Sequence, residues 1–286
     1  MLAQFLTKAW ALEPSYHNRM ANIILSQAGK GSVGVTINKD TRKTPYYERA
    51  QAIGDSRGYK YSPKLQTKSG LVAIIPIIGS MSRYGDYCSY GTEDIGAWIM
   101  EANADPMVSG IVLEINSPGG EVDGTELLGE IVLQSQKPIV AYVAGMAASA
   151  AYWVASQCRE IIMESETSSE VGSIGVLSMH VDASVAYEKE GYKVTIIRSE
   201  GSENKALFNS IEPLSADMIL KVQGEMKPIR DAFVGKVKSG RPQIIGDVYD
   251  GSMFNGKAAV KNKMANSIGY LGDAVRRVDT LSRKSS

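Results

Sequence analysis

From Gly70 onward, short apolar runs alternate with amphipathic segments along the chain. The apolar runs predict strands at Leu71–Pro76, Gly110–Ile115, Ile139–Val143, Glu160–Glu164, Ser173–Leu177 and Lys193–Ile197. Between them, the 3.6-residue periodicity predicts helices near Glu93–Ala104, Gly124–Gln134, Ala147–Ser156 and Ala183–Glu190. Strands that alternate with helices favour an α/β fold with a largely parallel central sheet and flanking helices.

The regions on either side of this pattern are less regular. Residues 1–68 form an expected N-terminal extension, an arm or partner-binding segment, with one helix near Pro14–Gln27. A long helix is expected from Ser215 to about Lys238, with a kink or break at Pro228. The tail should contain a short strand and a small helix. The expected domain spans residues 69–281, and the polar residues 282–286 are expected to fray.

The composition is that of an ordinary water-soluble protein. Of 286 residues, 44% are hydrophobic, and the 31 basic side chains balance the 31 acidic ones. A zero net charge does not favour nucleic acid or an anionic membrane surface as a partner. The apolar runs near 71–78 and 139–151 are interrupted and shorter than the ~20 residues of a bilayer helix, so no membrane span is expected.

The cysteine count also limits the chemistry. Cys88 and Cys158 are far apart and provide neither a disulfide framework nor a metal-ligand spacing. A reducing, cytoplasmic location is therefore expected, with no metal and no cofactor.

Two segments carry the clearest candidate chemistry. Residues 115–120 read Ile-Asn-Ser-Pro-Gly-Gly after a buried strand, and such glycines allow backbone N–H groups to point into a cleft. Residues 145–152 read Gly-Met-Ala-Ala-Ser-Ala-Ala-Tyr and place Ser149 where a strand gives way to an alanine-rich helix. A serine at the positive end of a helix, facing an oxyanion cradle, predicts acyl transfer.

A nucleophilic serine needs a base to remove its proton, and histidine is the first choice. The only histidines are His17, in the extension, and His180, which follows the expected strand Ser173–Leu177. His180 remains open as a base.

Lysine is the alternative, because burial can lower a lysine pKa from ~10.4 toward ~7–8. Lys205 follows the expected strand Lys193–Ile197 and precedes Ala-Leu-Phe, so its surroundings permit desolvation. Lys193, on that strand, is a further candidate.

Four segments, in this order, resemble the signal peptide peptidase (SppA) family of serine proteases, which is related to the ClpP/crotonase fold. They are residues 115–120, residues 145–152, Val-Gly-Ser-Ile-Gly-Val at 171–176, and the lysine loop. The later runs 233–241 and 251–258 resemble the family's closing helix and its Gly-x-x-Phe-x-Gly-x-x-Ala element. The resemblance covers residues 70–278.

This resemblance implies a serine endopeptidase with a Ser/Lys dyad. Ser149 would be the nucleophile and Lys205 the general base, with Ser173 as possible support for the lysine amine. The oxyanion hole would use the backbone N–H of Gly119 or Gly120 and that of Ala150. Residues 171–176 lack the histidine that ClpP carries there, which counts against a ClpP-type triad.

The opening Ala9–Pro14 resembles the phage-encoded branch of the family, which processes capsid and scaffold proteins during head assembly. The expected partners are therefore protein or peptide substrates, among them capsid, portal or scaffold proteins. Family members commonly assemble into rings, so a homo-oligomer is expected, located in the host cytoplasm or the assembling procapsid.

The chain departs from the family pattern in two places. Alanines 150 and 151 replace the usual Gly-Gly after the nucleophile, and the lysine loop lacks the usual Gly-x-Tyr-Lys form. Three alternatives stay open: a bacterial signal-peptide peptidase, a crotonase-like acyl-CoA enzyme, and a non-catalytic assembly or scaffold protein.

Overall fold

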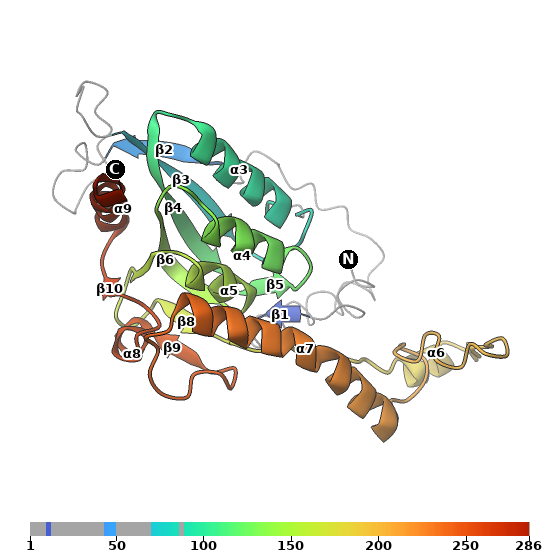
Figure 1. Cartoon of the computed structure of the whole chain (residues 1–286). Helices are drawn as coiled ribbons and strands as arrows, with labels where there is room; N and C mark the ends of the chain where they lie inside the picture. Colours follow the sequence, from blue (N-terminus) through green and yellow to red (C-terminus); the bar gives the residue numbers. More distant parts are fainter. Residues whose placement is uncertain (1–9, 13–42, 50–69, 86–88, 286) are drawn as a thin grey trace.

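A computed structural model describes residues 10–12, 43–49, 70–85 and 89–285 (Figure 1). Its main sheet contains, in spatial order, β10 (Ser267–Ile268), β7 (Glu160–Met163), β6 (Ile139–Ala148), β4 (Val108–Ser117), β3 (Leu71–Ile78) and β2 (Tyr46–Arg49). Neighbouring strands along this order are parallel, except that β2 is antiparallel to β3. The expected α/β fold with a largely parallel sheet is confirmed.

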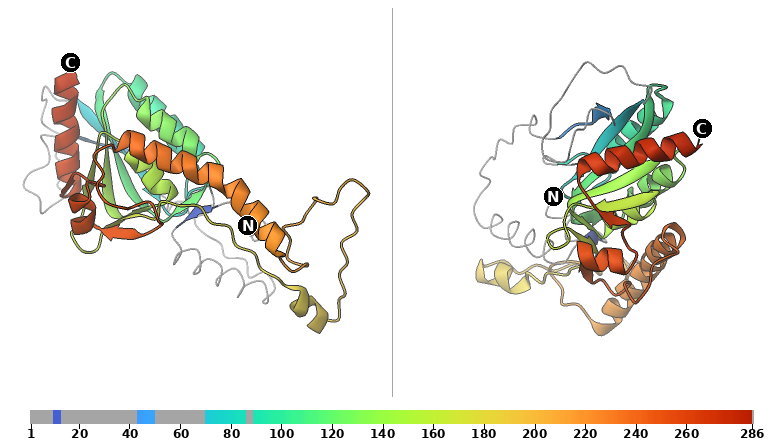
Figure 2. Two further views of the ribbon diagram at one scale, coloured as in Figure 1. Left: turned by 60° about the horizontal axis from the view of Figure 1, so that its bottom comes forward. Right: turned by 90° about the vertical axis from the view of Figure 1, so that its left-hand side faces the viewer.

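Helices cover both faces of the sheet (Figures 1 and 2). One face packs against α3 (Thr92–Ala104), α4 (Thr125–Leu133), α5 (Ala150–Ser156) and the C-terminal part of α7 (Ala216–Gly240). The other face packs against α9 (Leu271–Ser285). Alternate residues of the central strands enter the two cores, which explains why these strands are mainly apolar.

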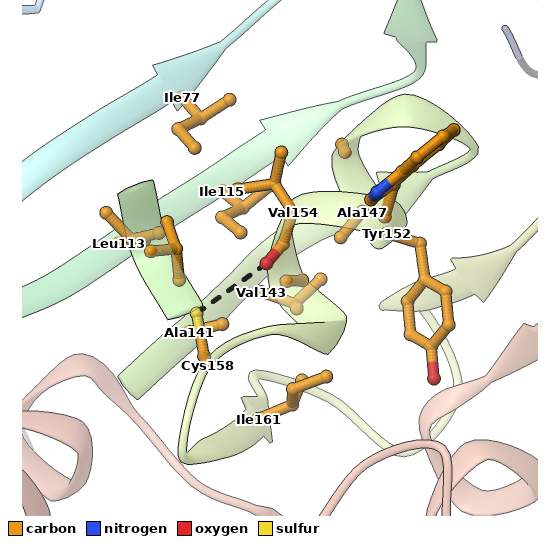
Figure 3. Packing of buried hydrophobic residues seen from close by; sticks show 14 of the residues in the cluster. Ile77, Leu113, Ile115, Ala141, Val143, Ala147, Tyr152, Val154, Cys158 and Ile161 are labelled. Atoms are coloured by element: carbon orange, nitrogen blue, oxygen red, sulfur yellow. Dashed lines mark hydrogen bonds between the residues drawn. The ribbon is translucent and has the colours of Figure 1, made fainter. Parts of the chain in front are cut away.

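Figure 3 shows the larger core where α5 meets the sheet. Leu113, Ile115 and Val143 of the strands surround Val154 of the helix, and Cys158 lies at its end. The Cys158 thiol is buried, and this burial raises its pKa to about 12. A thiol held protonated in this way is a packing group, not a nucleophile.

Two expected strands differ from the structure. In place of Ser173–Leu177, the strand is β8 (Glu170–Gly172), which pairs with the end of β6 and with β9 (Met253–Asn255). Residues 193–197 form no strand, because none of the strands in the described part of the chain pairs with their backbone. Their apolar character therefore has another cause.

The expected helices are present, with ends shifted by a few residues. They include α6 (Ser184–Lys189) and the long α7, which runs through Pro228 without a break. Pro228 is exposed, so the carbonyl that loses its helical partner there can be solvated by water. The tail contains β9, α8 (Gly256–Lys261), β10 and α9, and α9 includes residues 282–285.

Two described parts of the expected extension join the core. The strand β1 (Trp10–Leu12) pairs with β5 (Gly119–Glu121), and β2 extends the main sheet. The helix expected near Pro14–Gln27 and residue Cys88 lie outside the described residues. Among the helices described, none is long and apolar enough to cross a bilayer.

Candidate functional site

An irregularity between β4 and β6 brings the two candidate segments together. Residues 111–115 of β4 pair regularly with residues 139–143 of β6, but the register then shifts so that Ser117 lies opposite Ala147. The Ser-Pro-Gly-Gly turn therefore lies beside the end of β6. Its residue Ser117 is opposite Ala147, which precedes Ser149 by two residues. The carboxyl end of a parallel strand is where α/β sheets usually bind ligands.

Ser149 occupies a strained turn between β6 and α5. Its φ is 54° and its ψ is −118°, a region that costs a non-glycine residue roughly 1–3 kcal/mol. The turn is held from both sides, because the Ser149 N–H donates to the Gly172 carbonyl at 2.8 Å and its carbonyl accepts from the Trp153 N–H at 2.9 Å. Such a strand-to-helix turn is the conformation that presents a nucleophilic serine in other α/β enzymes.

The Ser149 hydroxyl is buried, and the residue is 1% exposed. Within the described part of the chain, its Oγ has no hydrogen-bond partner. A buried hydroxyl without a partner is costly, and such groups cluster where function requires them. Ser149 therefore has the geometry of a nucleophile that awaits a base and a substrate.

The Gly-Gly turn is fixed by backbone bonds on one side. The Gly119 N–H donates to Ser117 Oγ at 3.2 Å, and its carbonyl accepts from the Met81 N–H at 2.8 Å. The Glu121 N–H donates to the Met81 carbonyl at 2.9 Å. Since backbone groups alternate along a strand, the Gly120 N–H points to the opposite side.

This arrangement distinguishes Gly120 from Gly119 as the oxyanion donor of the turn. The Gly119 N–H is already used inside the turn, whereas the Gly120 N–H is directed away from Met81. Ala150 is the first residue of α5, so its N–H has no partner within the helix. Since α5 and β5 are neighbours in the fold, the Ser149–Ala150 turn and Gly120 belong to adjacent elements.

Met81 and Gly172 shape the site through their backbones alone. Sequence reasoning missed both, because a backbone contact leaves no mark on residue type. The Gly-Ser-Ile-Gly motif was the available signal for Gly172.

We predict that Gly120→Ala destabilises the protein. A Cβ at Gly120 would lie 1.9 Å from the Met81 carbonyl oxygen and 2.6 Å from its carbon and nitrogen, and backbone cannot easily move aside. The free energy of unfolding should fall by about 1–3 kcal/mol in denaturant titrations.

Gly235→Ala is the matched control, because the same Cβ in helix α7 meets nothing within 4 Å. It should raise the free energy of unfolding by up to about 1 kcal/mol. Equal effects of the two variants would contradict the close approach of Met81 to Gly120.

Ser173 lies next to Gly172, the residue that holds Ser149. It is 5% exposed, has a φ of 52°, and its N–H donates to the Ser252 carbonyl at 2.8 Å. This second strained serine therefore lies next to the residue that holds Ser149 in place.

The structure does not bring Lys205 to Ser149 within one chain. Lys205 is exposed and lies in the segment between α6 and α7, which extends beyond the N-terminal end of α7 and away from the sheet (Figures 1 and 2). We call residues 178–214 the lysine arm. Lys193 is also exposed in it, and the His180 ring contacts Asn209 and Phe208 of the same arm.

The lysine arm is ordered by its own contacts. Arg198 pairs with Glu212 at 2.6 Å and donates to the carbonyls of Lys205 and Ala206, and the Ala183 N–H donates to the Ser210 carbonyl. These bonds hold the two ends of the arm together and fix the loop that carries Lys205.

The arm exposes apolar side chains that the body leaves uncovered. Val185, Tyr192 and Ile197 are 59%, 63% and 90% exposed. The only residues of α7 that are buried, Phe233 and Val237, lie in its C-terminal half, where Phe233 stacks on Trp153 at 4.8 Å. The arm is therefore rich in exposed apolar side chains, whereas α7 packs on the body only through its C-terminal half.

The Arg198–Glu212 pair predicts an acid-sensitive arm. Hydrogen bonds from Arg198, and then from Asn209, lower the Glu212 pKa from 4.5 to about 2. A lowered folded-state pKa stabilises the arm above pH 4.5, and this contribution is lost as the pH falls from 4.5 toward 2. The protection of the Ala183 amide against hydrogen exchange, measured relative to the intrinsic exchange rate at each pH, should therefore fall over that range.

The matched variant is Glu212→Gln, which cannot titrate. It should show no pH-dependent change in Ala183 exchange over this range beyond the intrinsic one. An acid transition that persists in Glu212→Gln would show that another group controls the arm.

In the described residues, no group of three or more histidine, cysteine or acidic side chains is placed to bind a metal. The chemistry on offer is a serine in a strand-to-helix turn that faces backbone donors. Fold and site together define an α/β protein with a candidate serine nucleophile at the edge of a parallel sheet.

The chain belongs to peptidase family S49, whose family model matches residues 131–284. This match includes Ser149, β8, the lysine arm and the closing elements.

Two phage proteins are among its relatives. The capsid assembly protease C of Escherichia phage lambda is 28% identical over 275 residues, which cover 92% of this chain and 61% of that protein. The head-tail preconnector protein GP5 of Enterobacteria phage P21 is 28% identical over 214 residues, covering 71% of this chain and 42% of that protein. The chain thus spans less than two thirds of the length of these relatives.

A solved structure of a mutant form of the 1510-N membrane-bound stomatin-specific protease is also similar. The aligned region covers 77% of this chain and 86% of the protease chain, with 16% sequence identity and a TM-score of 0.46.

Proposed function

We propose that this protein is a serine endopeptidase that uses Ser149 as its nucleophile. The observation that carries the proposal is the buried Ser149 Oγ, which has no hydrogen-bond partner among the described residues and lies in a strained turn beside the backbone donors of Gly120 and Ala150. Membership of peptidase family S49 supports it. The alternatives of a crotonase-like enzyme and of a non-catalytic scaffold gain no such support.

In the proposed reaction, the Ser149 oxygen attacks the carbonyl carbon of a peptide bond while a neutral amine accepts its proton. The N–H groups of Gly120 and Ala150 stabilise the negative charge that develops on the carbonyl oxygen. The C–N bond then breaks, and the protonated amine returns the proton to the leaving nitrogen. Water, activated by the same amine, hydrolyses the acyl-enzyme and regenerates Ser149.

Lys205 is the proposed amine, and a second copy of the chain is its proposed source. The long α7 holds the lysine arm away from its own site: from the anchor at Phe233 back to Ala216 the helix rises by roughly 25 Å. The exposed apolar residues of the arm, Val185, Tyr192 and Ile197, suit a docking contact with a neighbouring copy. A head-to-tail contact of this kind closes into a ring when the rotation between copies permits.

The proposed substrates are proteins of a phage head during its assembly, such as capsid, portal or scaffold chains. The support is the similarity over most of this chain to a phage capsid assembly protease, together with a head-tail preconnector protein. The proposed location is the host cytoplasm or the procapsid. A bacterial signal-peptide peptidase remains the alternative within the family.

The experiment that tests the activity needs no knowledge of the natural substrate. The purified protein is incubated with a dye-labelled unfolded protein, with and without prior treatment by a serine-directed phosphonate. Release of labelled peptides that the phosphonate stops supports the proposal. Peptide release that continues unchanged after complete phosphonate treatment would contradict it.

A further inference from the structure

The segment Trp10–Leu12 forms a strand on the edge of the candidate site. This strand, β1, is antiparallel to β5, with Trp10 opposite Glu121, Ala11 opposite Gly120 and Leu12 opposite Gly119. The two strands form a separate small sheet (Figure 1). The partner of β1 is thus the strand that begins with the Gly-Gly of the turn.

The backbone groups that face β1 follow from the bonds on the other edge of β5. There, Met81 bonds to the Gly119 carbonyl and to the Glu121 N–H. The N–H and the carbonyl of Gly120 consequently point toward β1, where the register places Ala11. In an antiparallel ladder, Ala11 and Gly120 then form the hydrogen-bonded pair, and the N–H groups of Trp10 and Leu12 point away from β5.

The N–H of Gly120 is also the proposed oxyanion donor. In this pairing, the Ala11 carbonyl faces that N–H, where the carbonyl of a bound substrate would have to lie. The backbone of a strand edge pairs with one strand at a time. Ser149, the proposed nucleophile, is 1% exposed and so has little contact with solvent.

We propose that Trp10–Leu12 is an internal occupant of the substrate-binding edge, which a protein substrate displaces when it binds. This inference rests on the proposed peptidase function and adds its regulation: the chain holds its own site closed. The expected ligand of the opened edge is an extended peptide that pairs with Gly120 through its main chain.

Proline substitutions test the pairing directly, because proline lacks an N–H. Ala11→Pro removes the donor to the Gly120 carbonyl. Leu12→Pro is the matched control, since the N–H that it removes points away from β5. Each variant is compared with wild type by hydrogen exchange at the Gly120 amide and by the rate at which a fluorophosphonate labels Ser149.

In Ala11→Pro, Gly120 exchange and Ser149 labelling should both accelerate by about fivefold or more, the change expected from one lost backbone hydrogen bond. Leu12→Pro should resemble wild type in both. A synthetic peptide of residues 6–16, added in excess, should slow the labelling of Ala11→Pro again.

Equal exchange and labelling in the two variants would overturn the inference. So would faster Gly120 exchange without faster labelling, because β1 would then pair with β5 without closing the site. A failure of the proposed function looks different: no form of the protein would be labelled, even where Gly120 exchange shows that the edge is open.

Discussion

Ser149→Ala should reduce proteolysis by about 10³-fold or more, because the proposed acyl-enzyme forms on the Ser149 oxygen. The measurement is the initial rate of peptide release from an unfolded protein substrate. The free energy of unfolding of Ser149→Ala should equal that of wild type or exceed it by up to about 1 kcal/mol, since the deleted hydroxyl is buried without a partner among the described residues. The loss of activity is then a loss of chemistry and not of folding.

Ser173→Ala is the matched control. It removes another buried serine hydroxyl at a strained position next to the same turn. It should retain a measurable rate, because Ser173 is proposed only to orient the amine. Activity in Ser149→Ala close to that of wild type would contradict the role of Ser149.

Lys205→Ala should be as inactive as Ser149→Ala, and a mixture of the two inactive proteins should recover activity. If each site combines Ser149 of one copy with Lys205 of the next, random mixing of the two variants in equal amounts leaves about one quarter of all sites intact. If both residues came from one chain, no intact site would form. The measurement is the peptide-release rate after the two variants have been mixed under conditions that allow subunits to exchange.

Lys193→Ala is the control for the arm, since Lys193 is a second exposed lysine of the same segment. It should leave the rate close to wild type. A mixture without activity, from variants that do form mixed oligomers, would contradict the supply of Lys205 by a second copy. Full activity in Lys205→Ala with loss in His180→Ala would overturn the dyad itself.

The central sheet could be predicted from sequence because its strands are buried on both faces. Residues 139–143 are apolar without interruption, and residues 110–115 are apolar except for Glu114; short apolar runs of this kind between amphipathic helices favour buried strands. Residues 193–197 are equally apolar and yet form no strand. A strand needs a partner, and none of the described strands pairs with this run, whose Ile197 side chain is exposed. The proposed docking of the lysine arm on a second copy would give these apolar residues a contact.

The site was partly predictable for a similar reason. The small residues around Ser149 and the Gly-Gly turn mark a close approach of backbones, which only certain residue types allow. The hydrogen bonds of Met81 with Gly119 and Glu121 and the pairing of β1 with β5 could not be predicted, because they are long-range backbone contacts that most side chains would permit. The position of Lys205 depends on the path of α7 and of the lysine arm. The pattern of apolar and polar residues in these segments does not predict that they extend away from the sheet.

Covalent labelling tests directly whether Ser149 is the nucleophile. The protein is labelled with a fluorophosphonate, digested, and the modified residue is located by mass spectrometry. We expect a single adduct on Ser149, formed faster as the pH rises because only an unprotonated amine can accept the serine proton. An adduct on another serine, such as Ser117 or Ser173, or none on a folded protein that cleaves peptides, would contradict it.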